Sequence, residues 1–170
     1  PLFYIAYFAM VLIGSFMVNG SKNPAVSFLG YNLIVIPLGL ILSVVLNAFS
    51  IAGMQTTIIT AFAITAIVTL AMMALSMAFP HFFLSLGRTL TITLLITIVA
   101  ELILAFMGAN LGFIDYVVVV IFCGYIGYDW ARANACAKTV DNAVDMAAEL
   151  YVDIINLFIR ILSILARSND

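Results

Sequence analysis

Six long apolar stretches follow one another along this chain and restrict what it can fold into. They comprise approximately residues 2–18, 30–49, 51–79, 86–107, 113–130 and 143–165. A helix needs about 20 apolar residues to cross the hydrocarbon core of a bilayer. Strands are excluded because the runs are too long and because open sheet edges cannot face lipid. The pattern therefore predicts an all-α, polytopic transmembrane bundle of six spans, with residues 1–170 forming a single transmembrane domain.

The composition is that of a membrane protein, and together with the missing motifs it argues against several classes of function. Hydrophobic residues make up 66% of the chain and charged residues 8%, whereas a soluble domain carries roughly 25% charged residues. The six Lys and Arg residues form no basic patch for nucleic acid. The HExxH, GxSxG, Walker and CxxC motifs of common enzyme classes are absent. We therefore expect a protein that is not an enzyme, binds no nucleic acid and has no resident cofactor.

Prolines indicate where the predicted helices bend or end. Pro37 lies inside the second stretch, where the missing backbone N–H is expected to kink the helix. Pro80 and His81 predict a turn region after the third stretch. That stretch, residues 51–79, is long enough to tilt or to extend beyond the bilayer.

The basic residues predict how the chain is oriented. Three alternate connections carry them: Lys22, then Arg88, then Arg132 with Lys138. If every stretch crosses once, these connections share one side, which the positive-inside rule makes cytoplasmic. Arg160 and Arg167 lie at the other end of the last stretch, against this rule. Either they serve structure, or the last segment does not cross fully.

A ladder of acids recurs every four residues at the start of the last stretch: Asp141, Asp145, Glu149 and Asp153. Residues four apart share one helix face, and Asn156 continues the stripe. A carboxylate inside a bilayer costs about 2.5–3.5 kcal/mol on insertion scales, so it usually faces a protein interior or a cavity. Glu149 and Asp153 are therefore candidate functional residues.

Asp129, near the end of the fifth stretch, is the predicted partner of this stripe. The connection from 131 to 142 is short, so the last two helices can pack as antiparallel neighbours and bring Asp129 near Glu149 or Asp153. Two carboxylates close together in a low-dielectric site share a proton or bind a cation. Calcium prefers six to eight oxygen ligands, which these acids, Asn156 and water could supply. The pair thus predicts a pH sensor, a proton relay or a calcium site.

Each acid also has a structural interpretation. Asp141 and Asp145 can be solvated at a helix start, where acids favour the positive end of the helix dipole. Glu149 and Asp153 can form structural ion pairs, for example with Arg132 or Arg160. Glu101, in the middle of the fourth stretch, either belongs to the same cavity or hydrogen-bonds a neighbouring helix.

An intramembrane protease is the enzyme class that such an acid pair could suggest. Asp129 and Asp153 superficially match the two aspartates that an intramembrane aspartyl protease uses. The Gly-x-Gly-Asp sequence of that family is absent. A two-residue signal is weak without the rest of the site, which argues against this class.

Three segments resemble the transmembrane Bax inhibitor motif family. Tyr125-x-x-Tyr128-Asp129 and the segment Leu150-Tyr151-Val152-Asp153-Ile154-Ile155-Asn156-Leu157-Phe158 are similar to its last two helices. Ala61-Phe62-Ala63-Ile64-Thr65-Ala66, followed by Leu75-Ser76, is similar to its fourth helix. The six stretches correspond in order and spacing to helices two to seven of a seven-helix member.

The resemblance implies a bundle around a central seventh helix, pH-sensitive calcium leak and, in eukaryotes, suppression of cell death. It also implies a two-aspartate sensor, which falls here on Asp129 and Asp153. Three departures are notable: the family's first helix has no counterpart, Glu149 is an added acid, and the usual basic latch is reduced to Lys22. Arg132 is the other candidate latch cation.

The predicted function is therefore a pH-sensitive calcium leak channel gated by Asp129 and Asp153, with Glu149, Glu101 and Asn156 along the ion pathway. The alternative is a non-conducting membrane interaction protein or an accessory subunit of a larger complex. Expected partners are the lipid bilayer, calcium or protons, and other membrane proteins. The expected location is a bacterial cytoplasmic membrane or a eukaryotic organelle membrane.

Overall fold

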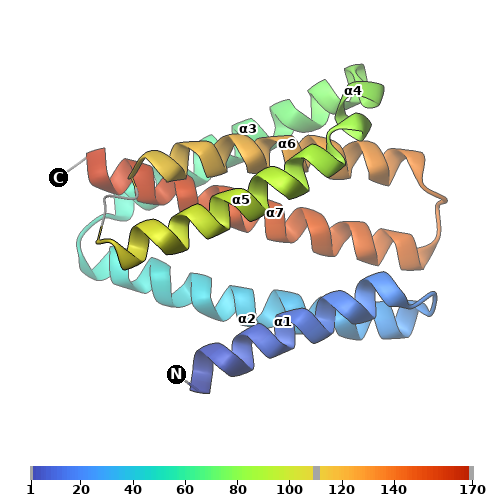
Figure 1. Ribbon diagram of the computed structural model, residues 1–170, viewed down its shortest axis with the longest axis horizontal. Helices are drawn as coiled ribbons and strands as arrows, with labels where there is room; N and C mark the ends of the chain where they lie inside the picture. Colours follow the sequence, from blue (N-terminus) through green and yellow to red (C-terminus); the bar gives the residue numbers. More distant parts are fainter. Residues whose placement is uncertain (1, 109–111, 169–170) are drawn as a thin grey trace.

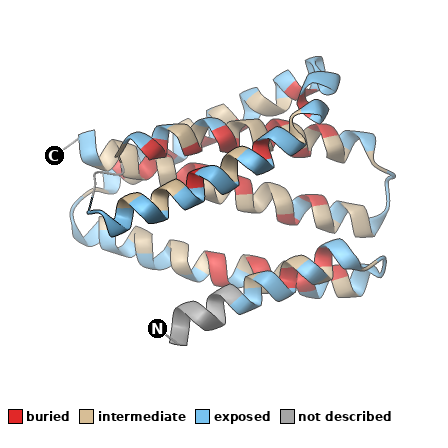
Figure 2. Ribbon diagram, in the orientation of Figure 1, coloured by how far each residue is buried: buried red, intermediate tan, exposed pale blue. Residues whose placement is uncertain are grey.

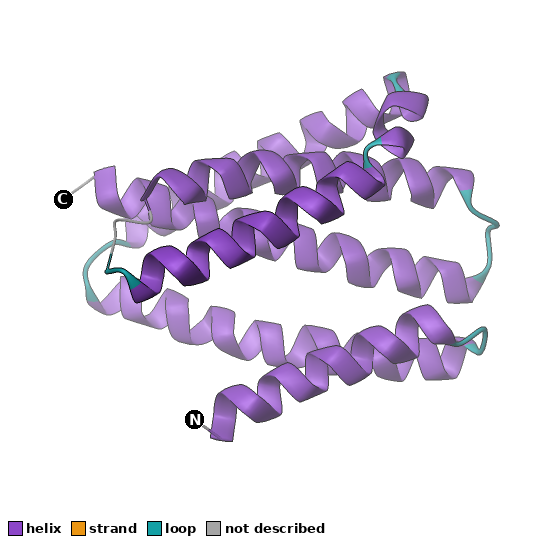
Figure 3. Cartoon of the chain, viewed as in Figure 1, coloured by secondary structure: helices purple, strands orange, loops and turns teal. Residues whose placement is uncertain are grey.

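The computed structural model describes residues 2–108 and 112–168, with side chains from residue 9 onward. Within these residues the chain is helical, and the predicted all-α class is confirmed (Figure 3). The helices are α1 (Leu2–Gly20), α2 (Pro24–Ile51), α3 (Gln55–Ala78), α4 (Pro80–Ser85), α5 (Gly87–Phe106), α6 (Gly112–Ala135) and α7 (Val140–Ser168).

The long helices run up and down in an elongated bundle (Figure 1). The α1–α2 connection, the region of α4 and the α6–α7 connection lie at one end of it, on the right in Figure 1. Lys22 and Lys138 lie in these connections, and Arg88 and Arg132 lie in the adjoining turns of α5 and α6. The end that they share is called the basic end below, and the end where α7 finishes is called the distal end.

Helix α7 packs against α6, α2, α3 and α1, so it takes the central place in the bundle. The main core lies between α3, α6 and α7, where Ile126 and Leu157 are fully buried. A smaller core joins α1, α2 and α7 around Val18 and Ile34. In α1 and α2 the backbones approach closely, since a Cβ at Gly14 would lie 2.7 Å from the carbonyl oxygen of Gly30. Small residues allow such contacts between membrane helices.

The break between α2 and α3 differs from the predicted one. Helix α2 begins at Pro24, where the Asn23 side chain accepts a hydrogen bond of 3.0 Å from the Ala25 N–H. It continues through the buried Pro37 and includes Ile51, which the sequence pattern had assigned to the third stretch. Gly53 then adopts a φ of 78°, a conformation that glycine adopts readily, and α3 begins two residues later.

The predicted turn at Pro80 and His81 is wrong, because this segment forms the short helix α4. Pro80 stands at the start of the helix, where proline is favoured because its missing N–H would have had no helical partner. Phe83 of α4 is buried against Gly127 of α6, and a Cβ at that glycine would clash with the Phe83 ring. Helix α4 thereby anchors the basic end of α6.

The exposed helix faces of the bundle (Figure 2) carry many large apolar side chains. Phe62, Leu70 and Ile96 are each more than 60% exposed. Four helices in the described part, α2, α3, α5 and α6, are long and apolar enough to cross a membrane. The described apolar part of α1, Ala9–Gly20, is shorter, and α7 carries several ionisable residues. The chain is thus a membrane protein with several apolar helices, whereas the six-span count stays a prediction.

Candidate functional site

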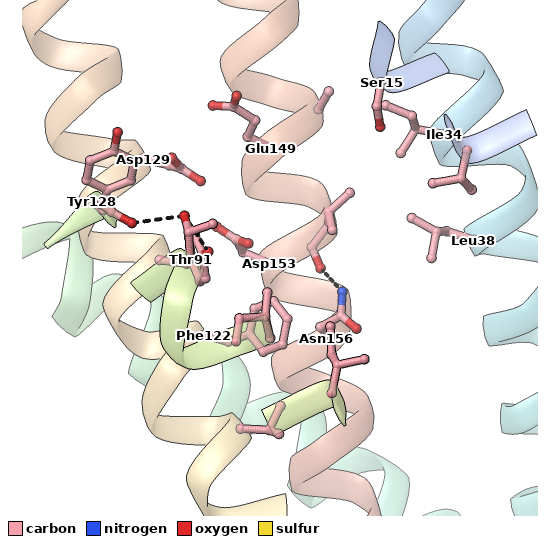
Figure 4. A pocket seen from close by; sticks show the side chains of 18 of the residues that line it. Ser15, Ile34, Leu38, Thr91, Phe122, Tyr128, Asp129, Glu149, Asp153 and Asn156 are labelled. Carbon is pink, nitrogen blue, oxygen red and sulfur yellow. Dashed lines mark hydrogen bonds between the residues drawn. The ribbon is translucent and has the colours of Figure 1, made fainter. Parts of the chain in front are cut away.

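A cavity of about 940 Å³ runs along one side of α7. Residues of α1, α2, α5, α6 and α7 line it (Figure 4). Among the described residues, α5 does not pack against α1 or α2. The space between α5 and the α1–α2 pair is therefore left for the cavity, with α6 and α7 forming the rest of its wall. Most of the lining is apolar, and charged residues lie towards its two ends.

One stripe of α7 faces this cavity. Glu149, Asp153, Asn156 and Arg160 all line it, and their spacing of four, three and four residues keeps them on one side of a helix. Asp145 belongs to the same acidic ladder but is not among the lining residues. The structure thus brings three of the predicted α7 residues to the cavity and adds a cation, Arg160.

Asp129 of α6 and Asp153 of α7 meet near the basic end of the cavity. The exposed fractions of these residues are 4% and 6%, and their carboxyl groups lie close enough for their charges to interact. A hydrogen bond between the two groups requires a proton on one of them, because two carboxylates offer only acceptors. Oδ2 of Asp153 has no hydrogen-bond partner among the described residues. This oxygen is free to accept a proton or to contact a cation.

Polar groups of α5 and α6 surround the pair. The Tyr125 hydroxyl donates to Oγ1 of Thr91 at 3.3 Å, which links α6 to α5 beside the two aspartates (Figure 4). The Thr91 hydroxyl in turn donates to the carbonyl of Gly87 in its own helix, at 3.0 Å. Thr91 thus bonds both the backbone of its own helix and a side chain of a neighbouring helix.

Arg132 joins the pair to Glu149. Its Nη1 lies 3.5 Å from Oδ1 of Asp129 and 3.0 Å from Oε2 of Glu149. Its Nη2 donates to Oε1 of Glu149 at 3.3 Å, and the guanidinium lies 5.7 Å from the centre of the Tyr128 ring. Of the two candidate latch cations, Arg132 therefore contacts the site. Lys22 is exposed and forms no ion pair with any described residue.

A second charged group lies at the distal end. Arg160 Nη1 donates to Oε1 of Glu101 at 2.5 Å and to Oδ1 of Asp115 at 2.6 Å. Its Nη2 donates to Oε2 of Glu101 at 3.1 Å. Arg167 pairs with the other oxygen of Asp115. Glu101 thus satisfies both of its predicted interpretations, since it lines the cavity and also hydrogen-bonds a neighbouring helix.

The structure also shows what sequence reasoning missed at this end. Asp115, only 4% exposed, was not singled out, although the burial cost that drew attention to Glu149 applies equally to it. Arg160 and Arg167 serve structure through these ion pairs, which accounts for their position against the positive-inside rule. Asp153, in contrast, pairs with neither Arg132 nor Arg160.

Asp141 is more than a solvated residue at a helix start. The hydroxyl of Ser27 in α2 donates to Oδ1 of Asp141 at 2.6 Å, and Ser27 is fully buried. This bond fixes the first turn of α7 against α2. Asp145 lies one turn further on, half-buried, and its Oδ1 has no hydrogen-bond partner among the described residues.

The four proposed calcium ligands do not form a preformed cage. In the described part of the chain, no three or more His, Cys, Asp or Glu residues cluster so that they could hold a metal ion. Glu149 is engaged by Arg132, and the Asn156 amide donates to the carbonyl of Val152 at 2.8 Å. These residues therefore do not supply together the six to eight oxygens that calcium prefers.

Comparison with known proteins identifies relatives along the whole chain. The family described as "Inhibitor of apoptosis-promoting Bax1" matches residues 1–170. An uncharacterized membrane protein of Streptococcus pyogenes serotype M6 is 31% identical over 99% of this chain and 76% of its own length. An uncharacterized protein of Helicobacter pylori strain 26695 is 33% identical over 51% of this chain and 37% of its own length. No solved structure matches the chain.

These findings agree with the segments in α3, α6 and α7 that suggested the family. The match extends over the whole chain rather than over the two-aspartate region alone, and the named streptococcal relative is a membrane protein. The chain belongs to the Bax inhibitor-1-like family of membrane proteins.

Proposed function

We propose that this protein is a pH-sensitive calcium leak channel in which Asp129 and Asp153 form the gate. The observation that carries the proposal is the pair of buried carboxyl groups at the wall of a 940 Å³ cavity. Burying two carboxyl groups is costly, and packing between α6 and α7 could be achieved with apolar residues instead. The cost of burying the two carboxyl groups is explained if the pair gains and loses a proton beside the cavity as part of the function.

The proposed gate works through the charge of the pair. With one shared proton, the hydrogen bond holds α6 and α7 together at the basic end and the cavity carries little negative charge. When that proton leaves, the two carboxylates repel each other; like charges about 4 Å apart would do so by about 4 kcal/mol at an effective dielectric constant of about 20. Asp129 can then turn towards Arg132, and the freed carboxylates can attract a cation into the cavity. Calcium flux should therefore rise with pH.

Within this proposal the chain crosses the membrane six times, with the basic end in the cytoplasm. The three connections that carry Lys22, Arg88 and Arg132 support that orientation through the positive-inside rule. The channel would act by passive conduction, without enzymatic chemistry and without a resident cofactor. Calcium contacts the acids only in transit.

The test is calcium flux into liposomes that contain the purified protein, measured at about pH 6 and about pH 8, a range that brackets a carboxyl group shifted by burial. We expect faster flux at the higher pH, and loss of this difference in Asp129→Asn and Asp153→Asn. Asp141→Asn is the matched control, because that carboxylate is also on α7 but does not line the cavity. Unchanged pH dependence in Asp153→Asn would refute the gate.

Absence of flux at both pH values, with the protein folded and inserted, would refute the channel itself. The non-conducting interaction protein would then be the better description. In that case the carboxyl pair would be a structural link between α6 and α7.

A further inference from the structure

The charged network at the distal end joins three helices around one guanidinium. Arg160 of α7 bonds Glu101 of α5 through both of its terminal nitrogens, at 2.5 and 3.1 Å. The same group bonds Asp115 of α6 at 2.6 Å, and Arg167 completes the network from the last turns of α7. Two cations face two acids, so the fully ionised network carries no net charge.

Two members of the network belong to the cavity wall. Glu101 and Arg160 line the cavity, whereas Asp115 and Arg167 do not. Arg160 follows Asp153 by seven residues, so it lies about 10 Å further along the same face of α7. The two charged clusters therefore occupy opposite ends of one cavity, and a path that enters at Asp129 and Asp153 reaches Arg160 next.

The positive charge of Arg160, held in place by its acidic partners, opposes the passage of cations. The side chains of Glu101 and Arg160 are 21% and 28% exposed, and that of Asp115 is 5% exposed. Removing one partner of such a buried pair is strongly unfavourable, because the other charge is left without compensation. A cation that moves through the cavity towards the distal end meets the positive guanidinium of Arg160 in the cavity wall, and like charges repel.

We propose that Arg160, held by Glu101 and Asp115, is a second closure of the cavity, in series with the aspartate pair. The inference rests on the proposed function for its consequence, that both ends must open for an ion to cross. Its structural content is independent of that function: the Glu101–Arg160 pair limits access of water-soluble molecules to the cavity from the distal end. Glu101 then holds Arg160 in the closed position and is not a free carboxylate along the ion pathway.

The experiment measures access rather than flux. Asn156→Cys places a thiol on the cavity wall between the two closures, in a background where Cys123 and Cys136 are replaced by Ser. A membrane-impermeant thiol reagent is added from the distal side to the full protein in sealed vesicles, and the labelling rate is measured. Glu101→Gln removes one charge, and Arg160→Lys keeps the charge but loses the two-pronged bond.

We expect labelling from the distal side to rise about tenfold or more in both variants, because each loses hydrogen bonds between charged groups. Leu102→Ala is the control, since this neighbouring residue is 56% exposed and does not line the cavity. Labelling that stays at the unmodified rate in both Glu101→Gln and Arg160→Lys would overturn the closure. It would reduce the network to a clamp between helices.

The same vesicles separate this inference from the proposed function. Increased labelling without calcium flux at any pH would support the closure and refute the channel. Flux that depends on pH through Asp153, with labelling unaffected by Glu101→Gln, would support the channel and refute the second closure.

Discussion

Removal of Arg160 should destabilise the protein through one specific partner, Glu101. In Arg160→Gln the carboxylate of Glu101 loses both of its bonds to the guanidinium. Asp115 loses one bond but keeps Arg167. Breaking a buried pair by removing one partner costs about 3–5 kcal/mol. Because Asp115 stays paired, we expect the lower end, about 3 kcal/mol.

The companion variants determine the coupling between the two side chains. Glu101→Gln leaves Arg160 bonded to Asp115, so we expect a cost of about 2 kcal/mol, the value of a hydrogen bond to a charged group. The double variant no longer holds an uncompensated Glu101. Its cost should therefore fall short of the sum of the single costs by about 1–2 kcal/mol, within the usual range for residues in contact.

The assay is reversible unfolding of the four proteins in mixed detergent micelles, followed by helix content and by fluorescence of Trp130. Single-variant costs that simply add, to within about 0.5 kcal/mol, would mean that Glu101 and Arg160 do not interact. That result would refute the reasoning on the distal network. The matched control pair is Leu102→Ala with Arg160→Gln, for which additivity is expected.

Four further substitutions test other contacts of the bundle, the first three by the same unfolding assay and the last by cross-linking between helices. Gly127→Ala should cost about 1–3 kcal/mol, because the new methyl group clashes with the Phe83 ring; an unchanged stability would contradict that contact. Ser27→Ala should cost about 1–3 kcal/mol through loss of its bond to the Asp141 carboxylate, and Asp141→Asn should cost less. Gly30→Ala should separate α1 from α2, since its Cβ would lie 2.8 Å from a backbone oxygen of α1; preserved cross-linking between these helices would argue against it.

Most of the helices could be predicted from the sequence because a bilayer imposes a simple length rule. Apolar runs of about 20 residues mark where helices lie, and the short connection from 131 to 142 predicted that α6 and α7 are neighbours, as they are. Helix α4 was missed because Pro80 was interpreted as a break. Proline ends a helix from within but also begins one, and the sequence around Pro80 does not distinguish the two.

The site was predictable in part for a similar reason. A carboxylate in an apolar run is expensive wherever it occurs, which drew attention to Asp153, Glu149 and Glu101. The ion-pair partners of these acids could not be predicted, because they depend on tertiary packing. Arg160 is 59 residues from Glu101 and 45 from Asp115 in sequence, and no local pattern connects them. In the same way, Glu149 pairs with Arg132 rather than with Lys22 because of how α6 packs against α7.

The central claim is that Asp129 and Asp153 share one proton at low pH and that the pair loses this proton as the pH rises through the physiological range. The most direct test is the infrared difference spectrum of the membrane-embedded protein between about pH 6 and about pH 8, in the region of the protonated carboxyl C=O stretch, since a carboxyl group shifted by burial titrates in this range. The account predicts a band that is present at the lower pH, decreases at the higher pH and disappears in Asp153→Asn. A spectrum with no such band, or a band that persists unchanged in Asp153→Asn, would contradict it.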